Sequence, residues 1–147
     1  MADRFATTVV IDRPIEEVFD FLADGTNDRK FSPRVQEINK TTDGPTGVGT
    51  VYASTVKDAG VKTKREFRLT EFERPTRIRW TEISKNIITV PEGGYDLAPE
   101  GTGTRLSVYN RFEGHGFGKL MAPLALRSAI KGADDFGRRI KAAIEAS

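Results

Sequence analysis

Few side chains in this sequence could perform acid–base or nucleophilic chemistry, and they form no recognisable catalytic set. There is one histidine and no cysteine, which excludes disulfides, thiolate catalysis and cysteine-based zinc sites. His115 lies in a glycine-rich segment at an expected strand-to-helix junction, where it could serve as an acid or base at a cavity mouth or simply be solvated. Because no histidines or carboxylates cluster at ligand spacing, we expect no metal site and no other cofactor.

Glu82 is the second candidate acid or base. It shares strand parity with Ile78 and Trp80, which would point its carboxyl group toward the protein interior. A buried carboxyl group holds its proton more tightly and could exchange it with a bound molecule. Alternatively, the strand ends near Thr81 and Glu82 already lies in water.

Asn110 is the best candidate for a polar group inside the molecule, because it alternates with Val108 and Phe112. It could contact a ligand, or its amide could be satisfied by neighbouring backbone. Aromatic residues with a polar tip are further candidates for a cavity wall, although core packing would equally explain them. These residues are Tyr52, Trp80 and Tyr95.

The elements that must position these residues begin with an expected strand at 5–12. Pro14 then suits the first turn of a helix, where its missing N–H is not needed. Apolar residues follow at helical spacing: Ile15, Val18, Phe19 and Leu22. A short helical turn is expected at about 27–31.

Residues 35–113 show a sequence pattern that is typical of an antiparallel sheet. Short runs rich in Val, Ile, Thr and aromatic residues are separated by turn clusters, and apolar and polar residues alternate within 104–112. No segment in this span could form a crossover helix. We therefore expect six consecutive antiparallel strands here, joined by 5–12 as a seventh.

The last segment, 118–146, is expected to form one long helix, with Pro123 at its start or at a kink. Phe136 and Ile140 are expected to be almost fully buried. Small residues dominate the N-terminal half: Ala125, Ser128, Ala129, Gly132 and Ala133. Together they favour a void, although Gly132 alone could equally mark a close approach to the sheet. The expected ligand contacts in this region are Phe117, Met121, Ala125 and Ala129.

The dimensions of these elements imply a curled sheet. Seven strands at ~4.8 Å spacing give a sheet roughly 30 Å wide, whereas one helix is only about 10 Å across. The sheet must therefore bend around the helix to cover its apolar face. The expected fold is an α+β helix-grip fold with a cavity between the sheet and the last helix.

The composition excludes several classes of function. At 147 residues the chain fits a single domain, 1–147, and its formal net charge is only +2. The densest basic run, 62–65, has no interleaved aromatic residues, so nucleic-acid binding is not expected. No window is long and apolar enough for a membrane span, and the N-terminus does not resemble a secretory signal. We expect a cytoplasmic protein.

The sequence resembles the START/Bet v1-like (SRPBCC) superfamily, in particular its bacterial polyketide cyclase/dehydrase and lipid-transport branch. The resemblance covers essentially the whole chain and is carried by segments 11–19, 31–33, 44–50, 71–75, 95–97 and 103–106. It implies the element order β-α-α-β6-α with a cavity between the sheet and the last helix. It implies no particular activity, because such folds host carriers, sensors and enzymes.

Three functions follow from these expectations. The leading one is binding of a small apolar molecule, aromatic or lipid-like, in the cavity. The second is an enzyme that folds and dehydrates a polyketide-like chain, acting through positioning and a Tyr, Asn or Glu that moves protons. The third is an accessory or stress-response domain whose cavity regulates contact with a partner. Inward-facing ionisable groups would favour the enzyme, and the sequence leaves a monomer or a homodimer open.

Overall fold

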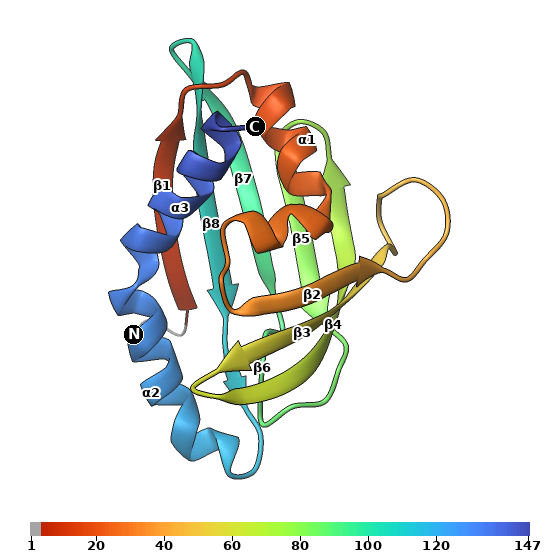
Figure 1. Cartoon of the computed structure of the whole chain (residues 1–147), viewed down its shortest axis with the longest axis vertical. Helices are drawn as coiled ribbons and strands as arrows, with labels where there is room; N and C mark the ends of the chain where they lie inside the picture. The colour runs from red at the N-terminus through yellow and green to blue at the C-terminus, as the bar shows by residue number, and fades with distance from the viewer. Residues whose placement is uncertain (1–3) are drawn as a thin grey trace.

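A seven-stranded antiparallel sheet dominates the computed structural model, which describes residues 4–147 (Figure 1). Its strands lie in the order β1-β8-β7-β5-β4-β3-β2. They span β1 Arg4–Ile11, β2 Val35–Lys40, β3 Val51–Asp58, β4 Val61–Glu73, β5 Arg77–Glu82, β7 Gly93–Glu100 and β8 Gly103–Arg111. A separate two-stranded ladder joins β6 (Ile88–Thr89) to β9 (Glu113–Gly114). The expected seven strands and their antiparallel pairing are confirmed.

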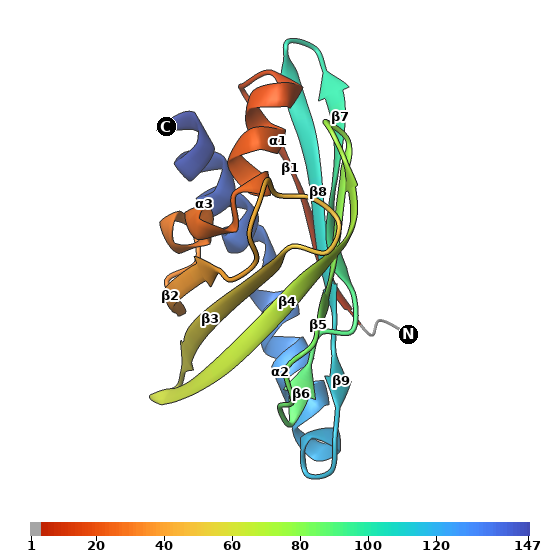
Figure 2. The same cartoon turned by 90° about the vertical axis from the view of Figure 1, so that its right-hand side faces the viewer.

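The sheet curls because two of its strands are bulged. The register shifts between Val35 and Glu37 on β2 and between Leu69 and Glu71 on β4. An extra residue on one strand bends it and increases its twist. Figure 2 shows the result, in which β2, β3 and part of β4 turn away from the plane of β1, β7 and β8. The concave side of this half-barrel faces the helices.

The helices are α1 (Ile15–Ala23), the 3₁₀ helix η1 (Gly25–Lys30), α2 (Gly118–Lys131) and α3 (Ala133–Glu145). The expectation of one unbroken C-terminal helix is wrong, because the helix is interrupted at Gly132. There φ is −94° and ψ is 3°, and the glycine N–H still bonds to the carbonyl oxygen of Ser128. Glycine is a poor helix former, which favours an interruption at this position.

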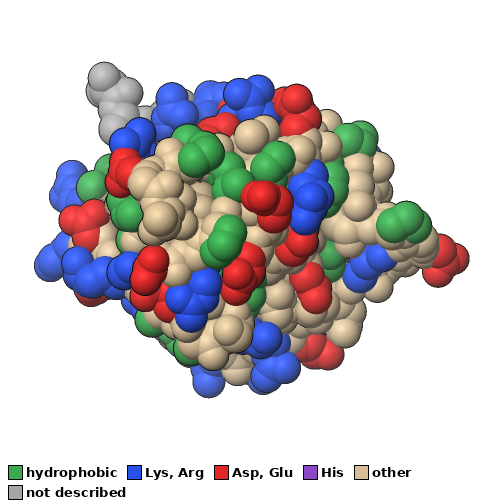
Figure 3. All heavy atoms as spheres, turned by 90° about the horizontal axis from the view of Figure 1, so that it is seen from above, with side chains coloured by type: hydrophobic (Ala, Val, Ile, Leu, Met, Phe, Trp, Pro, Cys, Tyr) green, Lys and Arg blue, Asp and Glu red, His purple; other side chains and the backbone are tan. Residues whose placement is uncertain are grey.

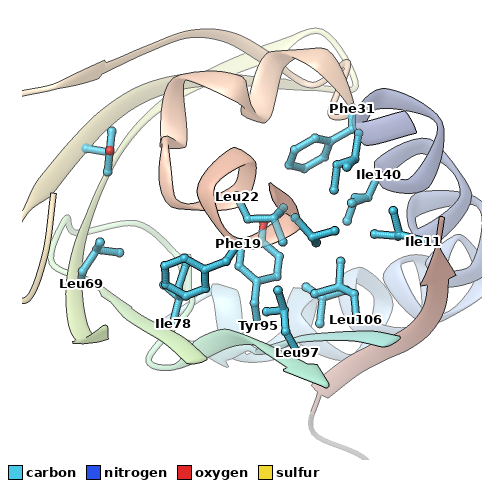
Figure 4. Packing of buried hydrophobic residues seen from close by; sticks show 14 residues of the cluster. Ile11, Phe19, Leu22, Phe31, Leu69, Ile78, Tyr95, Leu97, Leu106 and Ile140 are labelled. Carbon is cyan, nitrogen blue, oxygen red and sulfur yellow. The ribbon is translucent and has the colours of Figure 1, made fainter. Parts of the chain in front are cut away.

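The packed core lies between the sheet and the helices α1 and α3 (Figure 4). Helix α1 contributes Val18, Phe19 and Leu22, and α3 contributes Ile140 and Ile144. Sheet residues complete the cluster, among them Ile11, Leu69, Ile78, Leu97 and Leu106. Hydrophobic burial of this cluster is the main force that holds the helices on the sheet.

Phe136 is only partly buried, which corrects the expectation of near-complete burial, whereas Ile140 is fully buried as expected. The Phe136 ring packs edge-on against Phe5 at 5.7 Å and Phe31 at 5.8 Å between ring centres. The Arg139 guanidinium lies over the ring at 5.7 Å. Phe136 sits in the first turn of α3, beside the interruption at Gly132, and so lies at the margin of the core.

The close approach of the C-terminal helices to the sheet occurs at Gly137. A Cβ atom at Gly137 would lie 3.3 Å from Thr7 Oγ1 on β1, whereas one at Gly132 would approach only helix carbonyl oxygens, the nearest being Ser128 at 3.7 Å. A side chain at 137 would therefore push α3 away from β1. Gly132 does not mediate contact with the sheet.

Candidate functional site

Beyond the packed core, the concave face is lined mainly by polar and charged side chains. Inward-facing residues at the lower ends of β4, β5 and β8, together with β3 residues opposite them, are half-buried as whole residues, although the Glu82 side chain itself is buried. We call this surface the lower inner face; it consists of Ser54, Thr63, Arg65, Trp80, Glu82 and Asn110. Helix α2 runs along this end of the molecule (Figures 1 and 2). Its half-buried residues are small or moderate in size: Ala122, Ala125, Leu126 and Ala129.

A hydrogen bond crosses the sheet on this face. Trp80 Nε1 on β5 donates to Asn110 Oδ1 on β8 at 3.0 Å, passing over the intervening strand β7. Gly93 lies beneath the bond, since a Cβ atom there would overlap Asn110 Oδ1 and lie 2.6 Å from Trp80 Cε2. Glycine is therefore required at 93 by a close approach of side chains. The Asn110 amide nitrogen makes no hydrogen bond to a residue in the range 4–147 and remains available as a donor.

Tyr95 connects this pair to the core. Its ring is buried and meets the Trp80 ring edge-on, with ring centres 4.9 Å apart. Figure 4 shows it rising from β7 toward the helix that carries Leu22. Every fully buried side-chain nitrogen or oxygen within residues 4–147 has a hydrogen-bond partner, yet the Tyr95 hydroxyl has none. The hydroxyl must therefore keep some accessible surface. Burial, and to a smaller extent the charge of Asp28, raise the pKa of Tyr95 well above its usual value.

Asp28 is an acidic residue of η1 that lies close enough to Tyr95 to influence it electrostatically. Burial of its carboxyl group, with a smaller contribution from the charge of Asp24, raises the pKa of Asp28 to about 7. Its side chain makes no hydrogen bond within the described part of the chain. A carboxyl group with such a pKa can both donate and accept a proton near neutral pH.

Glu82 points inward, as its strand parity predicts, but it is paired. Its side chain is fully buried, and that of Arg65 is 18% exposed, with Arg65 Nη1 3.0 Å from Glu82 Oε1. The carboxylate also accepts hydrogen bonds from Ser84 Oγ, Asn86 Nδ2 and the Val90 N–H. With all these donors in place the group holds the loop between β5 and β7 against β4. Its geometry leaves little room for a role as acid or base.

The sequence matches a family model described as polyketide cyclase / dehydrase and lipid transport over residues 2–145. The chain belongs to this family. No curated protein matches the sequence significantly.

Solved structures with the same fold cover almost the whole of this family member. A protein from Thermus thermophilus superposes with a TM-score of 0.80 at 18% identity, covering 97% of each chain. A START superfamily protein from Mycobacterium smegmatis gives 0.78 at 14% identity, covering 99% of each chain. The Zhui aromatase/cyclase from Streptomyces sp. R1128 gives 0.76 at 16% identity, covering 97% of this chain and 93% of its own. At these identities the similarity establishes the fold alone. The family match over residues 2–145 confirms the expected polyketide cyclase/dehydrase and lipid-transport branch.

The remaining aromatic candidate, Tyr52, belongs to the core. Its ring packs against Gly25 of η1, and its hydroxyl donates to the Ala23 carbonyl oxygen at 3.3 Å. The hydroxyl also lies 3.2 Å from Thr46 Oγ1. Tyr52 thus anchors η1 to β3, and its polar tip is already occupied.

His115 lies outside the lower inner face. It is exposed on the loop after β9, with Nε2 2.8 Å from Thr89 Oγ1 and 3.5 Å from Glu113 Oε1. Its backbone N–H also donates to the Ile87 carbonyl oxygen at 2.8 Å. These contacts connect the β6–β9 ladder to the start of α2. The structure gives His115 a position at the surface, in the turn that also carries Phe117.

The four candidates from the region of α2 divide into two groups. Ala125 and Ala129 are half-buried on the side of the helix that also carries Ala122 and Leu126. Phe117 and Met121 are exposed. The helical face assigned from the sequence is half-buried or buried at Ala125, Ala129 and Ile140, and Met121 is its exposed member.

Two residues of the site were missed by sequence reasoning. Arg65 alternates with Phe67 and Leu69 on β4, a signal that could have placed it on the inner face. Asp28 gives no such signal, because a 3₁₀ helix of six residues has no apolar periodicity to orient it. In residues 4–147, no group of three or more His, Cys, Asp and Glu side chains could hold a metal ion.

Proposed function

We propose that the lower inner face binds a small, mainly apolar molecule that has one polar group. The observation that carries this proposal is the Tyr95 hydroxyl, which makes no hydrogen bond within residues 4–147 although its ring is buried in the core cluster and meets the Trp80 ring of the lower inner face. The Asn110 amide nitrogen offers a second free donor nearby, on the adjacent strand. Family membership supports ligand binding by the fold as a whole.

The lining supports an amphipathic ligand rather than a purely apolar one. Apolar and aromatic surface comes from Phe67, Trp80 and the half-buried side of α2, whereas Tyr95 and Asn110 supply directed polar groups. Few polar groups on an apolar wall are typical of small-molecule sites, since they fix orientation while the apolar wall supplies affinity. An aromatic or lipid-like compound with a hydroxyl or carbonyl group fits this description.

The binding experiment uses 2-naphthol and naphthalene, which differ by one hydroxyl group. Tyr95→Phe removes only the phenolic oxygen, so we expect 2-naphthol to bind about three- to tenfold more weakly and naphthalene to be unaffected. Stability should change little, because the hydroxyl makes no hydrogen bond within the described chain. Fluorescence titration and thermal melting give the two readouts.

Tyr52→Phe is the matched control. It removes a hydroxyl that is bonded to Ala23 and Thr46, so we expect it to lower the free energy of unfolding by about 1 kcal/mol and to leave naphthol binding unchanged. Equal weakening of both ligands by Tyr95→Phe, or no binding of either to the wild type, would contradict the proposal.

Filling the space beside α2 provides an independent test of the same site. Ala129→Phe places a ring on the half-buried side of α2, and we expect it to abolish naphthol binding with a stability loss below about 1 kcal/mol. The control Ala98→Phe lies at an exposed position on β7 and should leave binding unchanged. A strongly destabilised Ala129→Phe would mean that α2 packs tightly on the sheet there, and the ligand-binding proposal would be withdrawn.

A second function, proton-transfer catalysis of the polyketide cyclase or dehydratase type, is favoured by Asp28. A carboxyl group with a pKa of about 7 beside Tyr95 is suited to protonate a carbonyl oxygen or remove a proton next to one. The test of this second function measures how the stability of the protein depends on pH. Because the pKa of Asp28 is raised in the folded state, the folded chain keeps a proton that the unfolded chain releases between about pH 4 and pH 7. Stability therefore falls as the pH rises through this window.

Asp28→Asn should remove that slope, so the variant should be more stable than the wild type at about pH 8 but not at about pH 4. Asp43→Asn, at an exposed loop position, is the control and should melt like the wild type at both pH values. Identical pH profiles for Asp28→Asn and the wild type would remove the support for an acid–base role.

A further inference from the structure

Helix α2 presents an uncovered apolar surface to solvent. We call it the α2 outer face; it consists of Phe117, Leu120, Met121 and Leu124. Leu120 is 72% exposed, Phe117 66% and Leu124 56%. Residues spaced like these lie on one side of a helix; Leu124 points away from the half-buried Ala122 and Ala129, and Met121 lies at the border next to Ala125. Grouped apolar side chains of this size on a protein surface mark an interaction site.

The surface extends beyond the helix. Ile87, which is 56% exposed, lies beside the start of α2, because a Cβ atom at Gly118 would overlap the Ile87 backbone. Ile83 is exposed on the same connection between β5 and β6. Figures 1 and 2 place α2, β6 and β9 together at one end of the long axis. The apolar surface therefore forms the tip of the molecule.

The charges around the tip are mostly of one sign. Residues 117–132 contain Lys119, Arg127 and Lys131 and no acidic residue. Lys85 is exposed on the adjacent loop, and Glu113 is the acidic side chain of β9, beside His115. The opposite end of the molecule differs, since Figure 3 shows basic and acidic side chains interspersed there with scattered apolar ones. The tip thus combines an apolar face with a positive border.

A second copy of the chain is a poor occupant for this surface. In a two-fold dimer the same patch meets itself, which would bring the lysine and arginine side chains of the two α2 helices close together. An anionic surface instead complements both features. A basic helix with an apolar face lies in the interface of a membrane, with its apolar residues among the lipid chains and its cations near the headgroups.

We propose that the α2 outer face docks the molecule on membranes that contain anionic lipids, with α2 lying parallel to the membrane plane. The 14 residues of α2 suit this orientation, and no helix within residues 4–147 has the length and apolar character needed to span a bilayer. This proposal is independent of the proposed ligand. Docking on a membrane would nevertheless place α2 and the lower inner face next to lipids, which are a source of apolar molecules.

The test is co-sedimentation with vesicles of phosphatidylcholine alone or mixed equally with phosphatidylglycerol. We expect binding to the mixed vesicles that weakens as salt is raised. The pair Leu120→Ser and Leu124→Ser should reduce the partition coefficient about tenfold or more, because each lost side chain removes apolar surface from the lipid. The pair Lys119→Gln and Arg127→Gln should reduce binding to mixed vesicles while leaving the weak binding to neutral ones unchanged.

The matched control is the pair Val10→Ser and Val48→Ser, which removes exposed apolar side chains away from α2 and should bind like the wild type. Circular dichroism verifies that each variant is folded. Absence of wild-type binding to mixed vesicles, or an equal loss in the control pair, overturns the proposal. A wild-type dimer in ultracentrifugation that the leucine pair converts to a monomer, without vesicle binding, would assign the face to self-association and also overturn it.

Discussion

Gly93 is the residue on which the polar pair of the inner face depends. Trp80 and Asn110 come from strands that are not neighbours, and their hydrogen bond is possible only because β7 carries no side chain between them. The bond fixes the indole ring that packs against Tyr95. The lack of a side chain at Gly93 thus allows the contacts that orient Trp80, Asn110 and Tyr95.

Gly93→Ala should therefore lower the free energy of unfolding by about 1–3 kcal/mol, because the methyl group would force the two side chains apart. It should also weaken binding of 2-naphthol. Urea denaturation and fluorescence titration measure the two effects. Gly47→Ala is the control, since nothing lies within 4 Å of its would-be Cβ atom. Equal stability of the two variants would show that the Trp80–Asn110 geometry is not restrictive.

Glu82 and Arg65 form the buried ion pair of the molecule's lower end, and removing one charge should be costly. Glu82→Gln removes the negative charge that balances the Arg65 guanidinium and replaces one accepting carboxylate oxygen with an NH2 group, which cannot accept from the surrounding donors. We expect a loss of about 3 kcal/mol in the free energy of unfolding. Asp20→Asn, which breaks the exposed pair with Arg74, should cost less than about 1 kcal/mol. Similar losses at the two sites would mean that the Arg65–Glu82 pair is well solvated.

At the scale of elements, the C-terminal helices are attached to the sheet unevenly. Helix α3 is fixed by Ile140 and Ile144 in the core and by the close contact of Gly137 with Thr7. Helix α2 buries no residue except Gly118, at its first position. The interruption at Gly132 separates a helix that holds the fold from one whose outer face is free.

Gly132→Ala should raise the free energy of unfolding by about 0.5–1 kcal/mol. Alanine fits the local backbone, its Cβ atom would meet only ordinary contacts, and it has the higher helix propensity. Gly137→Ala is the matched variant and should gain no stability, because its Cβ atom would press on Thr7 at 3.3 Å. Thermal melting compares them. An equal gain at both positions would contradict the assignment of Gly137 as the contact with β1.

At the scale of the whole molecule, the two ends of the long axis differ in how tightly they are packed. One end contains the packed core beneath α1 and α3, which supplies the stability. The other end carries the lower inner face and the exposed side of α2, where apolar surface is left uncovered. Looser packing at the end that carries the lower inner face is tolerable because the core at the other end already determines the fold.

Chelation should leave the whole molecule unchanged. We expect the same melting temperature and the same 2-naphthol affinity before and after dialysis against EDTA, because residues 4–147 contain no suitable group of ligands. A control protein with a structural zinc site verifies that the chelator is effective. A clear drop in melting temperature would reveal a metal site.

Much of the fold could be predicted from the sequence because the relevant signals are local. Alternation along a strand depends only on neighbouring residues, so it predicts the antiparallel sheet and an inward direction for Trp80 and Asn110; for Glu82 the sequence left open that the strand ends before it. The spacing of Val18, Phe19 and Leu22 likewise placed α1 on the core. The position of a residue in the alternating pattern predicts which face of the sheet its side chain occupies. This prediction uses only the neighbouring residues.

Which residues each inward-facing side chain contacts depends on the tertiary structure. Glu82 is neutralised because β4 brings Arg65 beside it, and Trp80 finds Asn110 because β7 separates them with a glycine. The Tyr95 hydroxyl is left unpaired, and the burial that raises the pKa of Asp28 arises from how η1 lies over the sheet. These are contacts between residues far apart in the chain, and no local pattern encodes which strands and helices become neighbours.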